Sequence, residues 1–147
     1  MSATIVDLLA EDVEREIPVM HSFSVDICVR GVHYYKIQPD IGIVLDFLPE
    51  DDPMSLIHDH YAIAVKTAGG NGRKIGHVPK FMSRYLYYFM RHGGTVTGRV
   101  IGSREHSFDL EQGGVQIPVS YSFMGPPRVA ESFKTNILRL IEENTLA

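Results

Sequence analysis

The side chains best suited to chemistry in this chain fall into two short polar clusters. The first is the run H-D-H at His58, Asp59 and His60, and the second spans His77 to Lys80. Imidazole, carboxylate and ammonium groups can bind a ligand, transfer protons or hold a metal ion. Which of these they do depends on whether the fold brings the two clusters together.

The stretch between the clusters has the pattern of a β-hairpin, which would bring them together. Residues 62–66 alternate small or polar side chains with larger apolar ones, as a strand with one buried face does. The run A-G-G-N-G at 68–72 can adopt the positive φ that a tight reversal needs. A second strand is predicted at 73–78, before Pro79, which cannot continue a ladder but is tolerated in a helix's first turn. We therefore expect a ligand site where the two polar ends meet.

The histidines also raise a metal hypothesis, because His and Asp can form a zinc site. In an extended segment His58 and His60 point to the same side and Asp59 to the other, so the three would need a turn to share an ion. No cysteine pair and no H-E-x-x-H motif accompanies them. We therefore expect no metal.

Motifs for catalysis are missing from the sequence. There is no G-x-S-x-G, no P-loop and no glycine-rich dinucleotide fingerprint. We expect no enzymatic activity and no cofactor. The enzymatic alternative is a metal-dependent hydrolase built on His58, Asp59 and His77, whose activity a chelator would abolish.

Apolar alternation and turn signals predict a mainly β fold with added helices. Pro118 favours an edge position or a bulge for the last strand, since proline cannot donate to a ladder. Residues 49–53 are predicted to form a rigid acidic loop, and 102–114 a polar loop. Five or six short strands around one mid-chain helix favour a small OB-like β-barrel. Besides the hairpin, strands are predicted at 23–29, 42–48, 95–101 and 115–124.

Helices are predicted mid-chain and near both termini. The mid-chain helix, 80–92, would have an inner stripe of Phe81, Tyr85, Tyr88 and Phe89. Amphipathic helices are predicted at 2–17 and 129–143, and we expect them either to pack on the barrel or to form a homodimer. The apolar face of the second would carry Phe133, Ile137, Leu138 and Ile141.

Size and composition indicate a single globular domain spanning 1–147. A chain of 147 residues with 44% hydrophobic and 22% charged residues can bury about two-thirds of its unfolded surface. No apolar run approaches the roughly 18 to 20 residues that a membrane span needs, and the N-terminus lacks a basic secretory region. We therefore expect no membrane partner. The single cysteine, Cys28, fits a reducing compartment, so we expect an intracellular protein.

The charge distribution is uneven although the net charge is −4. From Tyr61 to Arg104 there are eight basic residues and no acidic one, while the acids gather near 7–16, in 40–59 and in the tail. A basic central face can attract an anion locally. The plainer interpretation is a solvated charged surface.

Four runs carry a resemblance to a known family. They are G-V-H-Y-Y at 31–35, D-x-x-A-I-A-V at 59–65, I-G-H-V-P at 75–79 and F-M-G at 123–125. In their order and spacing they resemble the HIRAN domain, a small OB-like β-barrel found at the N-terminus of helicase-like-transcription-factor translocases and in stand-alone animal proteins. The resemblance covers about 22–125, with the terminal helices outside it.

The resemblance implies roles for individual residues. Tyr34 and Phe108 fall where the family stacks aromatic rings on bases. Asp59 falls where a carboxylate accepts the sugar hydroxyl of a terminal nucleotide. His77 and Lys80 fall near the backbone phosphate. Together these positions imply a pocket for a free 3′-hydroxyl end of single-stranded DNA.

Two positions of this site depart from the family pattern. His33 replaces an arginine that usually precedes the tyrosine, and His58 replaces an aromatic residue before the aspartate. Arginine is always charged, whereas His33 is mostly neutral at pH 7, so phosphate attraction should be weaker here.

The function implied by the resemblance is a non-enzymatic module that captures 3′ ends of single-stranded DNA in the nucleus. No ATPase motor is encoded in the chain, so DNA remodelling or repair would need a separate helicase or repair protein. The alternative is a protein-interaction or dimerisation module that kept the barrel and lost the pocket, with His33 and His58 as signs of drift. Salt-dependent oligonucleotide binding distinguishes the two functions.

Overall fold

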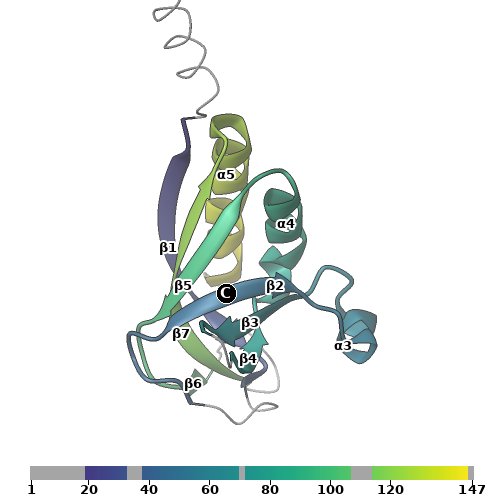
Figure 1. Cartoon of the computed structure of the whole chain (residues 1–147), viewed down its shortest axis with the longest axis vertical. Helices are drawn as coiled ribbons and strands as arrows, with labels where there is room; N and C mark the ends of the chain where they lie inside the picture. Colours follow the sequence, from purple (N-terminus) through teal and green to yellow (C-terminus); the bar gives the residue numbers. More distant parts are fainter. Residues whose placement is uncertain (1–18, 33–37, 70–71, 107–113, 146–147) are drawn as a thin grey trace, which may run out of the picture.

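The computed structural model describes residues 19–32, 38–69, 72–106 and 114–145, and shows a β-barrel flanked by helices (Figure 1). The helices are α3 (Pro53–His58), α4 (Lys80–Arg91) and α5 (Pro127–Thr145). The strands are β1 (His21–Arg30), β2 (Val44–Pro49), β3 (Ile63–Thr67), β4 (Lys74–His77), β5 (Thr95–Val100), β6 (Glu105–His106) and β7 (Val115–Gly125).

Six antiparallel strands close the barrel in the order β1-β4-β3-β2-β5-β7, because β7 pairs back onto β1. The β1–β7 ladder runs from His21 opposite Gly125 to Arg30 opposite Gln116. The short strand β6 extends this sheet from β7. The prediction of a small barrel of five or six strands is therefore confirmed.

The closure of the barrel between β1 and β4 depends on a glycine. Arg30 pairs with His77, and the neighbouring Gly76 lies so near that a Cβ there would be 2.3 Å from the Arg30 carbonyl oxygen. Only a residue without a side chain allows this approach of two backbones. Gly76 thus holds the strand that carries His77 in its place.

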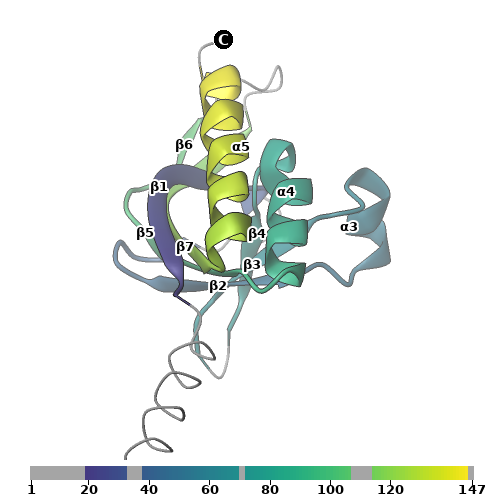
Figure 2. The ribbon, with the colours of Figure 1, turned by 90° about the horizontal axis from the view of Figure 1, so that it is seen from above.

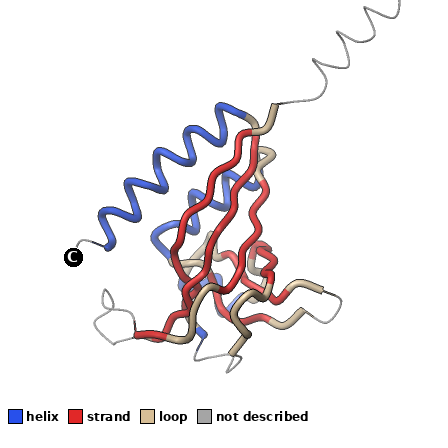
Figure 3. Tube along the Cα trace, turned by 90° about the vertical axis from the view of Figure 1, so that its left-hand side faces the viewer, coloured by secondary structure: helices blue, strands red, loops and turns tan. Residues whose placement is uncertain are grey.

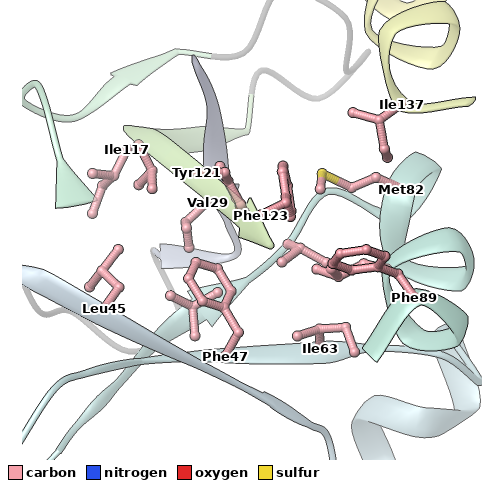
Figure 4. Close-up of a cluster of buried hydrophobic side chains, with 14 of the residues drawn as sticks. Val29, Leu45, Phe47, Ile63, Met82, Phe89, Ile117, Tyr121, Phe123 and Ile137 are labelled. Carbon is pink, nitrogen blue, oxygen red and sulfur yellow. The ribbon is translucent and has the colours of Figure 1, made fainter. Parts of the chain in front are cut away.

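The barrel interior is filled by alternate residues of the strands, as strand geometry requires (Figure 4). In β7 the fully buried residues are Ile117, Val119, Tyr121 and Phe123. The Tyr121 hydroxyl donates a 2.6 Å hydrogen bond to the Cys28 carbonyl oxygen, so its polar atom is satisfied inside the core. The side chain of Cys28 is itself buried.

The helices α4 and α5 lie side by side against one side of the long strands (Figures 2 and 3). Phe133 of α5 stacks on Phe89 of α4 with ring centroids 4.3 Å apart, and both rings meet Phe123 of β7. The C-terminal helix therefore packs on the barrel and extends its core.

Two residues that were predicted to lie on the buried faces of helices are exposed. Tyr88 and Leu138 are exposed by 42% and 47%. Each is the sequence neighbour of a buried residue, Phe89 or Ile137, and adjacent residues point about 100° apart around a helix. In α4 the buried residues are the predicted Phe89 and three that were not predicted, Met82, Ser83 and Leu86.

The helix α3 was not predicted, since residues 49–53 were expected only to form a loop. Its first turn follows Asp52, whose carboxylate accepts a hydrogen bond from the Met54 N–H at 3.1 Å, and Pro53 occupies the first turn. An Asp cap followed by proline is a helix-start signal. Figure 1 shows this helix projecting away from the barrel.

The prediction of an edge position or a bulge for Pro118 is also wrong, because β7 has partner strands on both sides and its register with β1 runs through Pro118 without a shift. Pro118 lies within β7 opposite Cys28 of β1, while on its other side the partner changes from β5 to β6. The Pro118 carbonyl there accepts the Ile101 N–H at 3.0 Å. Its missing N–H falls at the junction of two partner strands, where a ladder bond is already interrupted.

Several predicted features fall outside the described residues. They include the helix at 2–17 and the residues His33, Tyr34 and Phe108. Among the described helices, none combines the length and apolar character that crossing a bilayer requires.

Candidate functional site

Asp59 joins the end of α3 to the first turn of α4. Its Oδ1 accepts the Tyr61 N–H at 3.0 Å, and its Oδ2 accepts the Ser83 hydroxyl at 2.6 Å. Ser83 is buried, and Asp59 is half-buried. The aspartate is therefore a turn cap that also receives a short hydrogen bond from a second element. Both bonds fix the direction in which the carboxylate points.

Lys80 lies close to Asp59 in the fold because both are tied to Ser83. The Ser83 hydroxyl lies 3.0 Å from the Lys80 carbonyl oxygen, and Lys80 begins α4 with its side chain exposed. The positive end of a helix and a lysine at its first residue both favour an anion at this place. The structure thus brings the carboxylate and one predicted cation to the same end of α4.

His58 and His60 flank Asp59 but do not share its environment. Both side chains are exposed, and the Nδ1 of His60 lies 3.5 Å from the Leu56 carbonyl oxygen of α3. No group of three metal-ligating side chains occurs in the part of the chain that the structure describes.

His77 faces a buried carboxylate that sequence reasoning missed. Its Nε2 bonds to an oxygen of Glu50, and Lys74 forms an ion pair with the same carboxylate at 2.7 Å. The Glu50 side chain is fully buried and also accepts backbone N–H groups of the loop before α3. No local pattern could reveal this pairing, because Glu50 follows β2 while its partners lie on β4, with β3 between them.

These partners stabilise the ionised form of the Glu50 side chain. Burial alone would raise its pKa, but hydrogen bonds from Lys74, His77 and the backbone lower it to about 2. The carboxylate therefore stays ionised at neutral pH. Lys74 is one of the eight basic residues from Tyr61 to Arg104, and its charge is neutralised by this internal ion pair.

Two residues that precede the segment 33–37 have contacts with other parts of the barrel. A Cβ on Gly31 would lie 3.9 Å from the Nδ1 of His77, so Gly31 lies beside the histidine. Arg104 donates a 3.3 Å hydrogen bond to the Val32 carbonyl oxygen. Gly31 and Val32, the last described residues before 33–37, thus lie close to His77 and Arg104 respectively.

Three tyrosines beside Asp59 form a cluster that sequence reasoning also missed. We call Tyr61, Tyr87 and Tyr88 the tyrosine cluster, since their ring centroids lie 5.3 to 5.7 Å apart. The hydroxyls of Tyr61 and Tyr88 are 3.4 Å apart, and this hydrogen bond raises the pKa of Tyr61. The guanidinium groups of Arg84 and Arg91 lie over the rings of Tyr61 and Tyr87.

A groove of about 590 Å³ continues from this cluster between α4 and α5. Tyr88 belongs both to the tyrosine cluster and to the groove. Tyr85, Phe89 and Phe133 also line it, and Arg84 and Arg128 lie on its two sides, one from each helix. The spacing of Arg84, Tyr88 and His92 along α4 is the signal that could have indicated one polar face, because residues four apart are neighbours on a helix.

Comparison with known proteins gives both a family and a fold. The HIRAN domain model matches residues 22–125. The crystal structure of the HIRAN domain of human HLTF is similar with a TM-score of 0.59 and 19% identity, over 80% of this chain and 88% of that one. The HLTF HIRAN domain in its DNA-bound conformation, solved by NMR, has a TM-score of 0.58 and 19% identity, over 87% of this chain and 95% of that one. No curated protein matches the sequence.

Proposed function

Because the chain belongs to the HIRAN-domain family, we propose that it is a non-enzymatic nucleic-acid-binding module that captures the 3′-hydroxyl end of single-stranded DNA. The observation that carries the proposal is the likeness, over most of both chains, to a HIRAN domain whose structure was solved in a DNA-bound conformation. The position of Asp59 beside the cationic end of α4 supports it.

Asp59 is suited to accept the terminal hydroxyl. A carboxylate has about four acceptor positions, and the Tyr61 N–H and the Ser83 hydroxyl use one on each oxygen. A sugar hydroxyl can therefore add a charge-assisted hydrogen bond to a carboxylate whose direction is already fixed. Such preorganisation reduces the entropy that binding costs.

The phosphate before the terminal sugar would meet cations. Lys80 is exposed at the first residue of α4, where the helix dipole adds to its charge. His77 is less available to the phosphate, because its Nε2 is bonded to the Glu50 carboxylate. His33, next in the chain after Val32, and His58, at the end of α3, would line the same pocket, with Tyr34 and Phe108 stacking on bases.

The rival function is a protein-interaction module on the same barrel. The observation in its favour is that Asp59 and His77 are both engaged inside the protein, as purely structural residues would be. The homodimer through the terminal helices belongs to this rival, and the groove between α4 and α5 shows that α5 leaves part of its surface open.

Oligonucleotide titrations at several salt concentrations separate the two functions. A DNA-binding module loses affinity as salt rises, with a slope of about 0.7 per phosphate contact on a double-logarithmic plot. It also loses affinity in Tyr34→Ala and Asp59→Ala, each checked for folding by circular dichroism. Binding that is absent, or that neither substitution changes, would contradict the proposal and favour the interaction module.

A further inference from the structure

We propose that the groove between α4 and α5, together with the tyrosine cluster, binds the single-stranded nucleotides that precede the captured 3′ end. This inference rests on the proposed function and lengthens its site from a terminal pocket to a track. The track would run from Asp59 across the tyrosine cluster and into the groove.

The first argument is that these features are continuous. Asp59 accepts the N–H of Tyr61, and the Tyr61 hydroxyl meets that of Tyr88 at 3.4 Å. Tyr88 in turn lines the groove. A strand whose last sugar lies at Asp59 therefore reaches aromatic rings first and the groove next, without crossing an acidic side chain among these residues.

The second argument is charge. Arg84 and Arg128 line the groove from opposite helices, both exposed, with His92 at one end of α4. No carboxylate is among the described residues that line it. Arginine binds phosphate oxygens through a planar, bidentate set of donors. A polyanion is the chemical class that fits such a lining.

The third argument is the mixture of aromatic and polar surface. Tyr85 and Tyr88 contribute aromatic side chains to the lining, and beside them lie the stacked, largely buried rings of Phe89 and Phe133. Ser132 and Asn136 on α5 add hydrogen-bonding groups. Stacking platforms beside cations are how proteins hold single strands without a sequence requirement. An inorganic anion would leave the rings unused, whereas unpaired bases use both parts.

The volume of the groove supports an organic ligand. It is about 590 Å³, within the range of roughly 300 to 1,000 Å³ typical of small-molecule sites. A phosphate ion alone would leave most of this space empty. A nucleotide with its base would occupy more of this volume and would bring its ring next to the aromatic lining.

The experiment compares a dinucleotide with an octanucleotide, both with a free 3′-hydroxyl, in the wild-type chain and in Arg84→Ala/Arg128→Ala. We expect the wild type to bind the octanucleotide more tightly by about fivefold or more per stacked base. The double variant should lose most of this gain, and its salt slope for the octanucleotide should fall by about 1.4. Its affinity for the dinucleotide should stay near the wild-type value.

Two controls sharpen the result. Arg73→Ala/Arg99→Ala removes the same charge from exposed residues outside the groove, and it should keep the gain with length. An octanucleotide that lacks its upstream bases keeps the phosphates but cannot stack, and it should bind less tightly than the intact one.

The outcomes separate this inference from the proposed function. If the octanucleotide binds no more tightly than the dinucleotide, the groove is not part of the site, while end capture stands. The same conclusion follows if both double variants lose equal affinity for the octanucleotide. If a baseless strand binds as tightly as an intact one, the groove holds charge alone and the stacking track is wrong. If no oligonucleotide binds, the proposed function itself fails.

Discussion

The hydroxyl of Ser83 donates a 2.6 Å hydrogen bond to Asp59 Oδ2, which ties the end of α3 to the first turn of α4. Through this bond one side chain serves two purposes. It satisfies a half-buried carboxylate, and it fixes the direction of the group that we propose holds a terminal hydroxyl. Asp59 is therefore both a structural hydrogen-bond acceptor and the proposed binding group.

Ser83→Ala tests this relationship. Removing the donor should cost about 1.5 to 3 kcal/mol in the free energy of unfolding, because hydrogen bonds to charged groups are worth that much. It should also weaken oligonucleotide binding at temperatures where the variant is folded, since Asp59 loses its orientation. Urea denaturation and fluorescence anisotropy measure the two effects. Unchanged binding in the folded variant would show that the orientation of Asp59 does not matter.

The buried carboxylate of Glu50 predicts a dependence of stability on pH. Its pKa lies at about 2 in the folded chain against an ordinary value of 4.5, so its contribution is complete above about 4.5 and is lost as the pH falls toward 2. Glu50→Gln should remove about 3 kcal/mol at neutral pH, because the buried ion pair between Glu50 and Lys74 is then lost. Stability measured from pH 3 to pH 7 should rise less steeply in the variant.

The exposed Glu131 provides the control for that measurement. Glu131→Gln changes the net charge by the same amount at a solvated position of α5, so the pH profile should match that of the wild type. Identical profiles for Glu50→Gln and the wild type would show that the ion pair contributes nothing.

Gly76→Ala should open the barrel. Its Cβ would lie 2.3 Å from the Arg30 carbonyl oxygen, which belongs to the backbone of β1 and cannot move aside cheaply. Gly42→Ala is a matched control, since Gly42 has a φ of +95° but nothing within 4 Å of an added Cβ. The control should cost only the backbone strain of about 1 to 2 kcal/mol. Thermal unfolding should show a clearly larger loss for Gly76→Ala, and equal losses would refute the role of Gly76 in closure.

Phe133→Ala tests whether α5 shares the core of the barrel. Its ring contacts both Phe89 and Phe123, so the substitution should cost about 3 to 5 kcal/mol. Leu138→Ala, at an exposed position of the same helix, should cost little. A single cooperative transition lowered only by the first variant would support one domain that includes α5. A barrel that unfolds normally in Phe133→Ala would indicate a helix that is merely attached.

Features that depend on local pattern could be predicted from the sequence. The alternation in β1, β3 and β7, the turn-forming glycines before β4 and the apolar spacing of α5 each reflect neighbours along the chain. These are the parts of the fold for which residues close in sequence determine the structure.

Features that depend on distant residues could not be predicted. Glu50 looked like one acid of a solvated loop, and only the pairing of β3 with both β2 and β4 places it beside Lys74 and His77. The tyrosine cluster likewise needs Tyr61 and α4 to meet in space. Tyr88 and Leu138 were misplaced because a helix stripe read from sequence does not say which flank faces the sheet.

The most direct measurement is the affinity for two oligonucleotides of identical sequence, labelled at the 5′ end, one ending in a 3′-hydroxyl and the other in a 3′-phosphate. Capture of the hydroxyl by Asp59 requires the phosphate to weaken binding by about tenfold or more, because a charge-assisted hydrogen bond is lost and two anions are opposed. In Asp59→Asn this difference should shrink. Equal affinities of the wild-type chain for the two ends would contradict end capture.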